Sequence, residues 1–136
     1  MDVDIMKDFQ ESLPKITVVA QDIGRVIMNV LDNAFYAVAS AKKTAGADFN
    51  PAVKIQTRLD GKSMVISITD NGPGIPEKVR AKVFDPFFTT KPTGEGSTGL
   101  GLSLAFDIVS KGHGGTLTLQ STEGQGARFE IRLPVG

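Results

Sequence analysis

The chain has 136 residues, a length that suits one domain with a hydrophobic core and leaves too little for a second domain of ordinary size. Its 15 basic and 15 acidic residues cancel, which argues against binding of nucleic acid or an anionic membrane through net charge. The absence of cysteine excludes disulfides and thiolate metal sites, and no apolar run approaches the roughly 20 residues that span a bilayer.

The N-terminal part of the chain predicts two short strands and a long amphipathic helix. The strands are expected at residues 3–9 and 15–20, on either side of a turn at Pro14. Asp22 is suited to cap the helix, because its side chain accepts hydrogen bonds from free backbone N–H groups. Apolar residues then recur at helical spacing to about Lys42: Ile23, Val26, Ile27, Val30, Leu31, Ala34, Phe35 and Val38.

A β-hairpin is expected next. Residues 53–59 and 64–69 alternate apolar and polar side chains, and Asp60-Gly61 between them favours a tight turn. The second strand of this hairpin brings Asp70 to its end.

A short helix and a long loop follow the hairpin. Residues 76–83 predict the helix, since proline is tolerated in a first helical turn and Glu77 suits the positive end of the helix dipole. From about residue 86 to 98, glycine, proline and threonine replace any periodicity. We therefore expect a mobile loop there, of the length usually kept for lids.

The C-terminal part predicts a helix and a second hairpin. The helix is expected over residues 100–111, and four residues are expected on its apolar side: Leu100, Leu104, Phe106 and Ile108. Strands at 115–120 and 127–133 flank a turn at 123–126. The whole order predicts an α+β fold, in which a mostly antiparallel sheet is covered on one face by helices.

Three polar residues share one stripe of the first helix. Asn29, Asn33 and Tyr36 are spaced four and three residues apart, which turns them away from much of its apolar face. A carboxamide oxygen can complete the oxygen shell of Mg²⁺. The plainer interpretation is that the two asparagines lie on a solvated helix face.

The sequence DNGPG at residues 70–74 suits the approach of a flat ligand. Gly72 and Gly74 let the backbone turn and come close to such a ligand, and the Asp70 carboxylate can accept a hydrogen bond from an exocyclic amine such as that of adenine. An ordinary turn without any ligand is the alternative.

Residues 96–101 form a glycine-rich start to the last helix, where free N–H groups can meet phosphate oxygens. Ser97 and Thr98 add hydroxyls, and Lys91 can pair with a phosphate. A flexible loop and a solvated lysine are the alternatives. The spacing differs from the Walker pattern, which needs Gly-Lys-Ser/Thr at the helix start.

The remaining candidates are aromatic residues and one histidine. Phe84, Phe87 and Phe88 most often mean core packing, although apolar anchors beside a lid can also control its closure. His113, the only histidine in the sequence, is interpreted as a helix-end residue without a catalytic role.

Taken together, four ordered blocks resemble the catalytic and ATP-binding domain of sensor histidine kinases, in the superfamily shared with gyrase B, heat-shock chaperones and mismatch-repair ATPases. Residues 29–34 are similar to the asparagine box of that family, 70–74 to its first glycine box, 84–88 to its phenylalanine box and 98–102 to its second glycine box. The resemblance covers nearly the whole chain, and it implies that residues 1–136 form a single kinase catalytic domain.

This resemblance implies a Bergerat-type two-layer α/β sandwich, with a mixed sheet under about three helices and Mg·ATP held between the first helix and the lid. Asn33 would hold Mg²⁺, Asp70 would bind adenine, and Gly99 and Gly101 would meet the phosphates. The full expected nucleotide set is Asn33, Tyr36, Asp70, Gly72, Gly74, Ile75, Phe88, Lys91, Ser97, Thr98, Gly99, Leu100, Gly101 and Leu102.

The resemblance also indicates the reaction. ATP-hydrolysing relatives have a glutamate at the position of Asn29 to activate water, and asparagine has no comparable basicity. Asn29 and Asn33 are therefore expected to serve phosphoryl transfer rather than hydrolysis. Two positions depart from the family pattern, because Tyr36 stands where many histidine kinases have Lys or Arg, and Ala127 stands where relatives often have Ser or Thr near adenine.

The expected acceptor is a histidine on a separate helical dimerisation domain of the same kinase, whose helices the sequence lacks. A response regulator would act downstream, and we expect no contact with nucleic acid or directly with the membrane. The N-terminus lacks the features of a signal peptide, so we expect a soluble, cytoplasmic domain of a parent that is either soluble or membrane-bound. The alternatives are a nucleotide-sensing module without phosphotransfer and an anti-sigma-type serine kinase.

Overall fold

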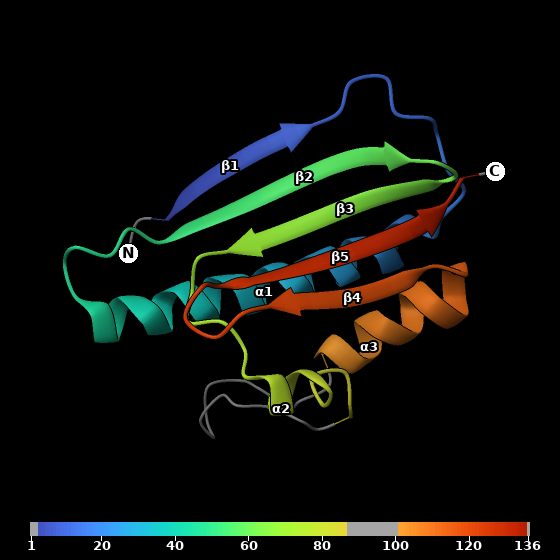
Figure 1. The fold of residues 1–136 in the computed structure, drawn as a ribbon. Coiled ribbons are helices and arrows are strands. Elements are labelled where there is room, and N and C mark those ends of the chain that lie inside the picture. The colour runs from blue at the N-terminus through green and yellow to red at the C-terminus, as the bar shows by residue number, and fades with distance from the viewer. Residues whose placement is uncertain (1–2, 87–100, 136) are drawn as a thin grey trace.

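The computed structural model describes residues 3–86 and 101–135, which form a sheet layer and a helix layer (Figure 1). The sheet order is β1-β2-β3-β5-β4; β1 pairs with β2 in parallel and the other pairs are antiparallel. The strands are β1 (Asp4–Phe9), β2 (Ala52–Asp60), β3 (Ser63–Asp70), β4 (Thr116–Ser121) and β5 (Ala127–Pro134). The expected α+β fold with a mostly antiparallel sheet is confirmed.

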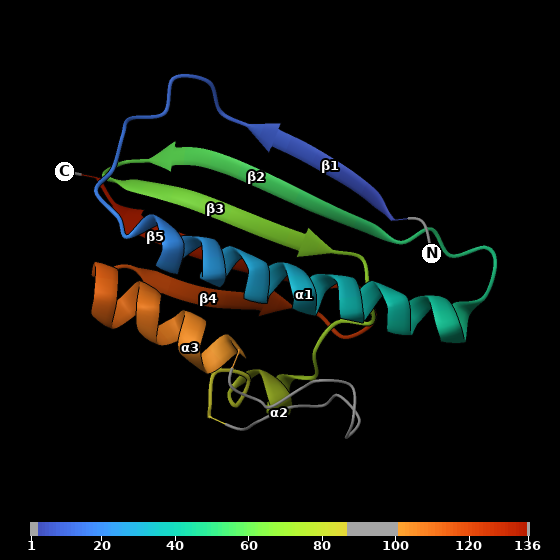
Figure 2. The same ribbon diagram turned by 180° about the vertical axis from the view of Figure 1, so that it is seen from behind.

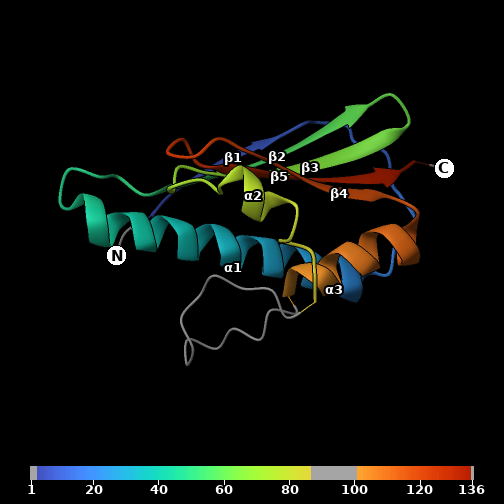
Figure 3. The ribbon, with the colours of Figure 1, turned by 60° about the horizontal axis from the view of Figure 1, so that its bottom comes forward.

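The helices of the described residues are α1 (Ala20–Ala45), α2 (Glu77–Arg80) and α3 (Gly101–Asp107), and α3 continues into the π-helical segment η1 (Ile108–Gly112). Figures 2 and 3 show α1 and α3 side by side on one face of the sheet, and the short α2 contacts β4. None of these helices combines the length and apolar character needed to cross a membrane.

The core lies between α1 and the inner face of the sheet. The buried residues of α1 recur at helical spacing: Ile23, Val26, Val30, Ala34, Val38 and Ala41. Alternate residues of the strands face them, including Ile66 and Ile68 of β3 and Phe129, Ile131 and Leu133 of β5. Both patterns were predicted, because apolar periods of helix and strand are direct consequences of burying one face.

The start of α1 differs from the prediction. The helix begins at Ala20, with Val19 as an N-cap that makes no side-chain hydrogen bond, and Asp22 lies within the first turn. Asp22 therefore does not cap the helix, although its negative charge suits that end of the dipole. At the other end the helix runs to Ala45, past the expected Lys42, and Gly46 follows with φ 83°.

The strand expected at residues 15–20 is wrong. Residues 13–19 are irregular, and Ile16 and Val18 pack against the core as the chain passes from the sheet to α1. The Val19 N–H donates to Nε2 of His113 at 3.0 Å rather than to a neighbouring strand. An alternating apolar pattern can thus cover a core without any strand pairing.

Two further helices differ from the prediction, the first in its length and the second in which of its residues are buried. The helix expected at 76–83 ends at Arg80, because the Lys82 and Asp85 N–H groups donate to carbonyls only three residues back. In α3, Leu104 and Phe106 are 40% and 37% exposed, whereas Ser103 and Ala105 are buried. Small side chains let α3 approach α1, and the π-helical segment η1 supplies the buried Val109.

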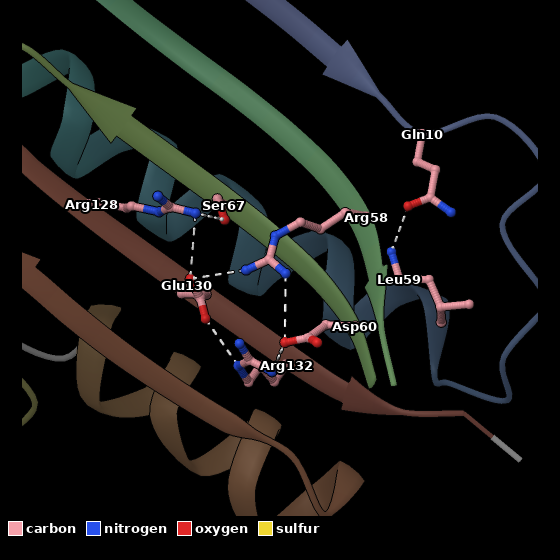
Figure 4. A network of polar contacts seen from close by, with 8 residues as sticks. All are labelled: Gln10, Arg58, Leu59, Asp60, Ser67, Arg128, Glu130 and Arg132. Carbon is pink, nitrogen blue, oxygen red and sulfur yellow. Dashed lines mark hydrogen bonds and ion pairs between the residues drawn. The ribbon is translucent and has the colours of Figure 1, made fainter. Parts of the chain in front are cut away.

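The outer face of the sheet carries a charged network that the sequence did not reveal (Figure 4). Glu130, only 7% exposed, lies among three arginines, with its Oε1 2.9 Å from Nε of Arg132. Arg128 lies on β5 together with Glu130 and Arg132, and Arg58 reaches the cluster from β2. Asp60 joins it through Arg132, whose hydrogen bond is the main cause that lowers the pKa of the Asp60 carboxyl.

Candidate nucleotide site

Asp70 ends β3 as a buried carboxylate that is held by backbone N–H groups. Its side chain accepts a 2.8 Å hydrogen bond from the Gly72 N–H, and the Ala127 N–H donates to it from β5. Burial raises the pKa of this carboxyl, and the two N–H groups oppose that effect only in part. The carboxylate is therefore fixed in direction and poorly solvated, which suits recognition of one hydrogen-bond donor on a ligand.

The glycines after Asp70 permit two close backbone approaches. A Cβ placed on Gly72 would lie 2.9 Å from the Cβ of Ala37 in α1. Gly74 has φ 76°, and a Cβ on it would collide with the carbonyl oxygen of Thr122. The loop therefore runs between α1 and the β4–β5 turn, and side chains at these positions would push it away from both.

Two supporting residues were missed in the sequence. Asn71 anchors one side of the loop, because its Nδ2 donates to the Asn50 carbonyl at 2.8 Å and its Oδ1 accepts from the Ala52 N–H at 2.9 Å. Ser121 anchors the other side through the Ile75 N–H. An aspartate or asparagine in a Gly-rich turn signals local hydrogen bonding in general, but its distant partners have no sequence signal.

The asparagines of α1 lie half-buried on the side of the helix toward α3. Nδ2 of Asn29 donates to the Gly101 carbonyl at 3.0 Å, and Nδ2 of Asn33 lies 3.4 Å from the Asn29 carbonyl. Both amide nitrogens thus face protein carbonyls, which leaves the side-chain oxygens as acceptors. Tyr36 is also half-buried, one turn beyond Asn33.

The donors present fit Mg²⁺ rather than a metal that prefers imidazole or thiolate. Within residues 3–86 and 101–135, no three His, Cys, Asp or Glu side chains gather in a way that could hold a metal. The carboxamide oxygen of Asn33 is a hard donor, and Mg²⁺ is usually bound by one or two protein oxygens together with waters and substrate phosphates.

The structure brings six of the predicted site residues along one stretch of α1: Asn29, Asn33, Tyr36, Asp70, Gly72 and Gly101. Gly101 meets the helix at Asn29, and Gly72 meets it at Ala37, eight residues further on. Eight helical residues rise about 12 Å, with Asn33 midway. At the Ala37 end, the Gly72 N–H donates to the Asp70 carboxylate. This run can carry an elongated ligand with a base-like group at one end and an anionic group at the other.

The other predicted residues lie elsewhere. Gly74 and Ile75 face the β4–β5 turn, and Leu102 packs against the core. Ala127, one of the two departures from the family pattern, pairs with Asp70 in the strand register. The expected lid at 86–98 lies outside the described residues except for Pro86, as do six site residues: Phe88, Lys91, Ser97, Thr98, Gly99 and Leu100.

Phe84 and His113 take structural positions. The Phe84 ring lies 5.2 Å from that of Phe106 and 6.2 Å from that of Phe129, which fits the expected role in packing. His113 follows η1, and its Nδ1 lies 2.9 Å from the Ile108 carbonyl, to which it donates, while Nε2 accepts from the Val19 N–H. These two partners define the neutral tautomer with hydrogen on Nδ1.

Comparison with known proteins gives one consistent family. Residues 18–136 match the model described as "Histidine kinase-, DNA gyrase B-, and HSP90-like ATPase". The chain is 36% identical over 134 residues to the signal transduction histidine-protein kinase AtoS of Escherichia coli K12, covering 98% of this chain and 20% of AtoS. It is 35% identical to the sensor histidine kinase ZraS of E. coli O157:H7, covering 92% of this chain and 24% of ZraS.

Solved structures agree with the sequence relatives. The catalytic domain of histidine kinase ThkA in a nucleotide-free form superposes with a TM-score of 0.79 at 30% identity, over 97% of this chain and 78% of that one. Full-length ShkA in complex with AMPPNP gives a TM-score of 0.77 at 25% identity, over 97% of this chain and 25% of that one. The chain thus spans about a fifth to a quarter of the curated relatives named here.

Proposed function

The chain belongs to the histidine kinase-, DNA gyrase B- and HSP90-like ATPase family, and we propose that it acts as one catalytic domain, residues 1–136, that binds Mg·ATP. In this proposal it donates the γ-phosphoryl group to a histidine on a separate helical domain of the same parent kinase, and a response regulator acts downstream. The domain works in the cytoplasm, where ATP is available.

The observation that carries the proposal is the line of contacts along α1. A buried carboxylate stands at the Ala37 end, Asn33 is in the middle, and the Gly101 backbone lies at the Asn29 end. Adenine at Asp70 and phosphates near Asn33 and Gly101 would fill this line in the order in which a nucleotide presents them. A Mg²⁺ ion, when bound to Asn33 and the phosphates, would neutralise charge that develops during transfer.

Transfer is favoured over hydrolysis because of the chemistry of Asn29. Its amide nitrogen is engaged by Gly101, and a carboxamide does not accept a proton from water at neutral pH. The chain's contribution is then to bind, orient and exclude water, which is the usual protein share in phosphoryl transfer. A sensing module without transfer and a serine kinase remain outcomes of the test below.

We expect this chain to bind ATP, to label no histidine of its own and to hydrolyse ATP slowly. Nδ1 of His113 carries a hydrogen that it donates to a carbonyl, and the Nε2 lone pair accepts from the Val19 N–H, so no lone pair is free to attack a phosphorus atom. The acceptor segment of the parent kinase, added in trans, should become labelled from γ-labelled ATP, slowly because the covalent tether that raises its effective concentration is missing.

The labelled product should be lost in acid, as phosphohistidine is. Label that survives acid would favour the serine kinase, and binding without label would favour the sensing module. Self-labelling that disappears in His113→Ala would show that the acceptor is wrongly assigned.

We expect Asn33→Ala to reduce the effect of Mg²⁺ on ATP affinity by at least about tenfold, the scale seen when support of a metal site is lost. The reason is the loss of the one protein oxygen proposed to hold the ion. ATP titrations with and without Mg²⁺ measure it, and Ser40→Ala, at an exposed position of the same helix, is the control. An unchanged response to Mg²⁺ in folded Asn33→Ala would assign the ion to another residue.

A further inference from the structure

Ser121, the last residue of β4, joins two segments that both hold the Asp70 carboxylate. Its Oγ accepts a hydrogen bond from the Ile75 N–H at 2.8 Å and donates one to the Gly126 carbonyl at 2.8 Å. Ile75 belongs to the loop whose Gly72 N–H donates to Asp70, and Gly126 directly precedes Ala127, whose N–H also donates to Asp70. One hydroxyl therefore links the two backbone segments that orient the carboxylate.

The surroundings make this link specific. Gly126 is buried with φ 91°, and a Cβ on it would collide with the Asp70 carbonyl oxygen, so the β4–β5 turn lies directly against the end of β3. A second contact joins the same segments, because the Gly124 N–H donates to the Pro73 carbonyl at 2.6 Å. That contact reaches the exposed tip of the loop, whereas Ser121 reaches its base.

We propose that Ser121 is a positioning residue for Asp70, and that it sets how well the site distinguishes adenine from a purine that lacks the exocyclic amine. The inference rests on the proposed function, since it deepens the role of the same site. Loss of the hydroxyl leaves the Ile75 N–H and the Gly126 carbonyl without this partner, so the base of the loop is held less closely to the start of β5. The carboxylate then loses the alignment of its two N–H donors.

The test compares Ser121→Ala with the unaltered chain for two nucleotides, ATP and purine riboside triphosphate, which has no exocyclic amine. We expect the preference for ATP to fall by about fivefold to tenfold, the scale of one ordinary hydrogen bond. Affinity for purine riboside triphosphate should change little, because it does not use Asp70. A role in stability alone would lower both affinities alike.

Two variants sharpen the comparison. Ser121→Thr keeps a hydroxyl and should retain most of the preference for ATP, which also covers the case in which Ser121→Ala does not fold. Thr118→Ala removes a hydroxyl from an exposed position of the same strand and should leave both affinities unchanged. The proposal would be overturned if folded Ser121→Ala kept the full preference for ATP. It would also be overturned if folded Ser121→Thr lost that preference while its Ile75 and Ala127 amides stayed protected from hydrogen exchange.

Amide hydrogen exchange separates this inference from the proposed function. Without any nucleotide, the Ile75 and Ala127 amides should exchange faster in Ser121→Ala than in the unaltered chain, while core amides of β5 stay protected. If each of these amides exchanged at the same rate in Ser121→Ala as in the unaltered chain, the positioning role would be overturned. Failure of the unaltered chain to bind ATP would overturn the proposed function instead, and the exchange result would still decide whether Ser121 holds the loop.

Discussion

Asp70→Asn is expected to lower the affinity for adenine nucleotides by about tenfold to a hundredfold, the range for altering a charged hydrogen-bond partner. The carboxylate is buried at the Ala37 end of the line along α1, and it already aligns with two backbone donors. An amide in its place presents N–H to groups that are themselves donors. Calorimetric titration with ADP measures the loss.

Stability should change much less than affinity in this variant. Removing a buried charge favours the folded state. The amide N–H that then faces one of the two backbone N–H groups leaves that donor without an acceptor, which destabilises the folded state by about 1–3 kcal/mol. Asp48→Asn, at an exposed position in the loop after α1, is the matched control and should bind as the unaltered chain does. Full ADP affinity in folded Asp70→Asn would remove this carboxylate from the site.

The same carboxylate gives the expected direction of pH dependence. Because burial raises its pKa in the folded chain, Asp70 takes up a proton at a higher pH than an exposed aspartate does. Protonation removes the negative charge and turns one acceptor oxygen into a donor, so affinity should fall on acidification in that higher range. The cost of burying the ionised carboxylate is present at neutral pH and is relieved as pH falls through the raised pKa, so Asp70 itself does not promote acid unfolding.

The second large effect is expected on folding. Gly126→Ala forces a left-handed backbone on a residue with a Cβ, which costs about 1–2 kcal/mol, and it drives that Cβ into the Asp70 carbonyl, for which about 1–3 kcal/mol is typical of overpacking. The free energy of unfolding should therefore fall by about 2–5 kcal/mol. Urea denaturation measures it.

Gly124→Ala separates the cost of backbone strain from the cost of the steric collision. Gly124 has φ 85°, close to that of Gly126, but a Cβ on it would meet nothing within 4 Å. It should cost only the backbone strain. Equal losses in the two variants would show that the close approach to Asp70 contributes nothing.

The sequence predicted most elements of this fold because their signals are local. The buried face of α1, the hairpin of β2 and β3 and the hairpin of β4 and β5 all follow from apolar spacing and turn residues. The prediction of a strand at residues 15–20 was wrong, because a local apolar pattern indicates which side chains are buried but not whether the backbone pairs with another strand. The predicted apolar side of α3 was wrong at Leu104 and Phe106. The small residues Ser103 and Ala105 are buried instead, which lets α3 pack closely against α1.

The candidate site divides in the same way. Asp70, Asn33 and the glycines were identified from motif and spacing, whereas Asn71 and Ser121 act through partners 19 to 46 residues away in sequence. In the network around Glu130, Arg128 and Arg132 lie two residues away on the same face of β5, but Arg58 comes from β2 and meets Glu130 only through the register of β2, β3 and β5. Distances between strands are set by the whole sheet, so no single segment encodes them.

The hydrogen bond from Asn29 to Gly101 has a consequence for how this candidate site can change over evolutionary time. A glutamate or aspartate at position 29 has no hydrogen to donate, so it would face the Gly101 carbonyl as one acceptor against another. A lineage could not acquire a carboxylate at position 29 through that replacement alone without loosening the junction of α1 and α3. Adjustment of α3 would have to accompany it, so an amide and a carboxylate at this position are separated by more than one mutational step.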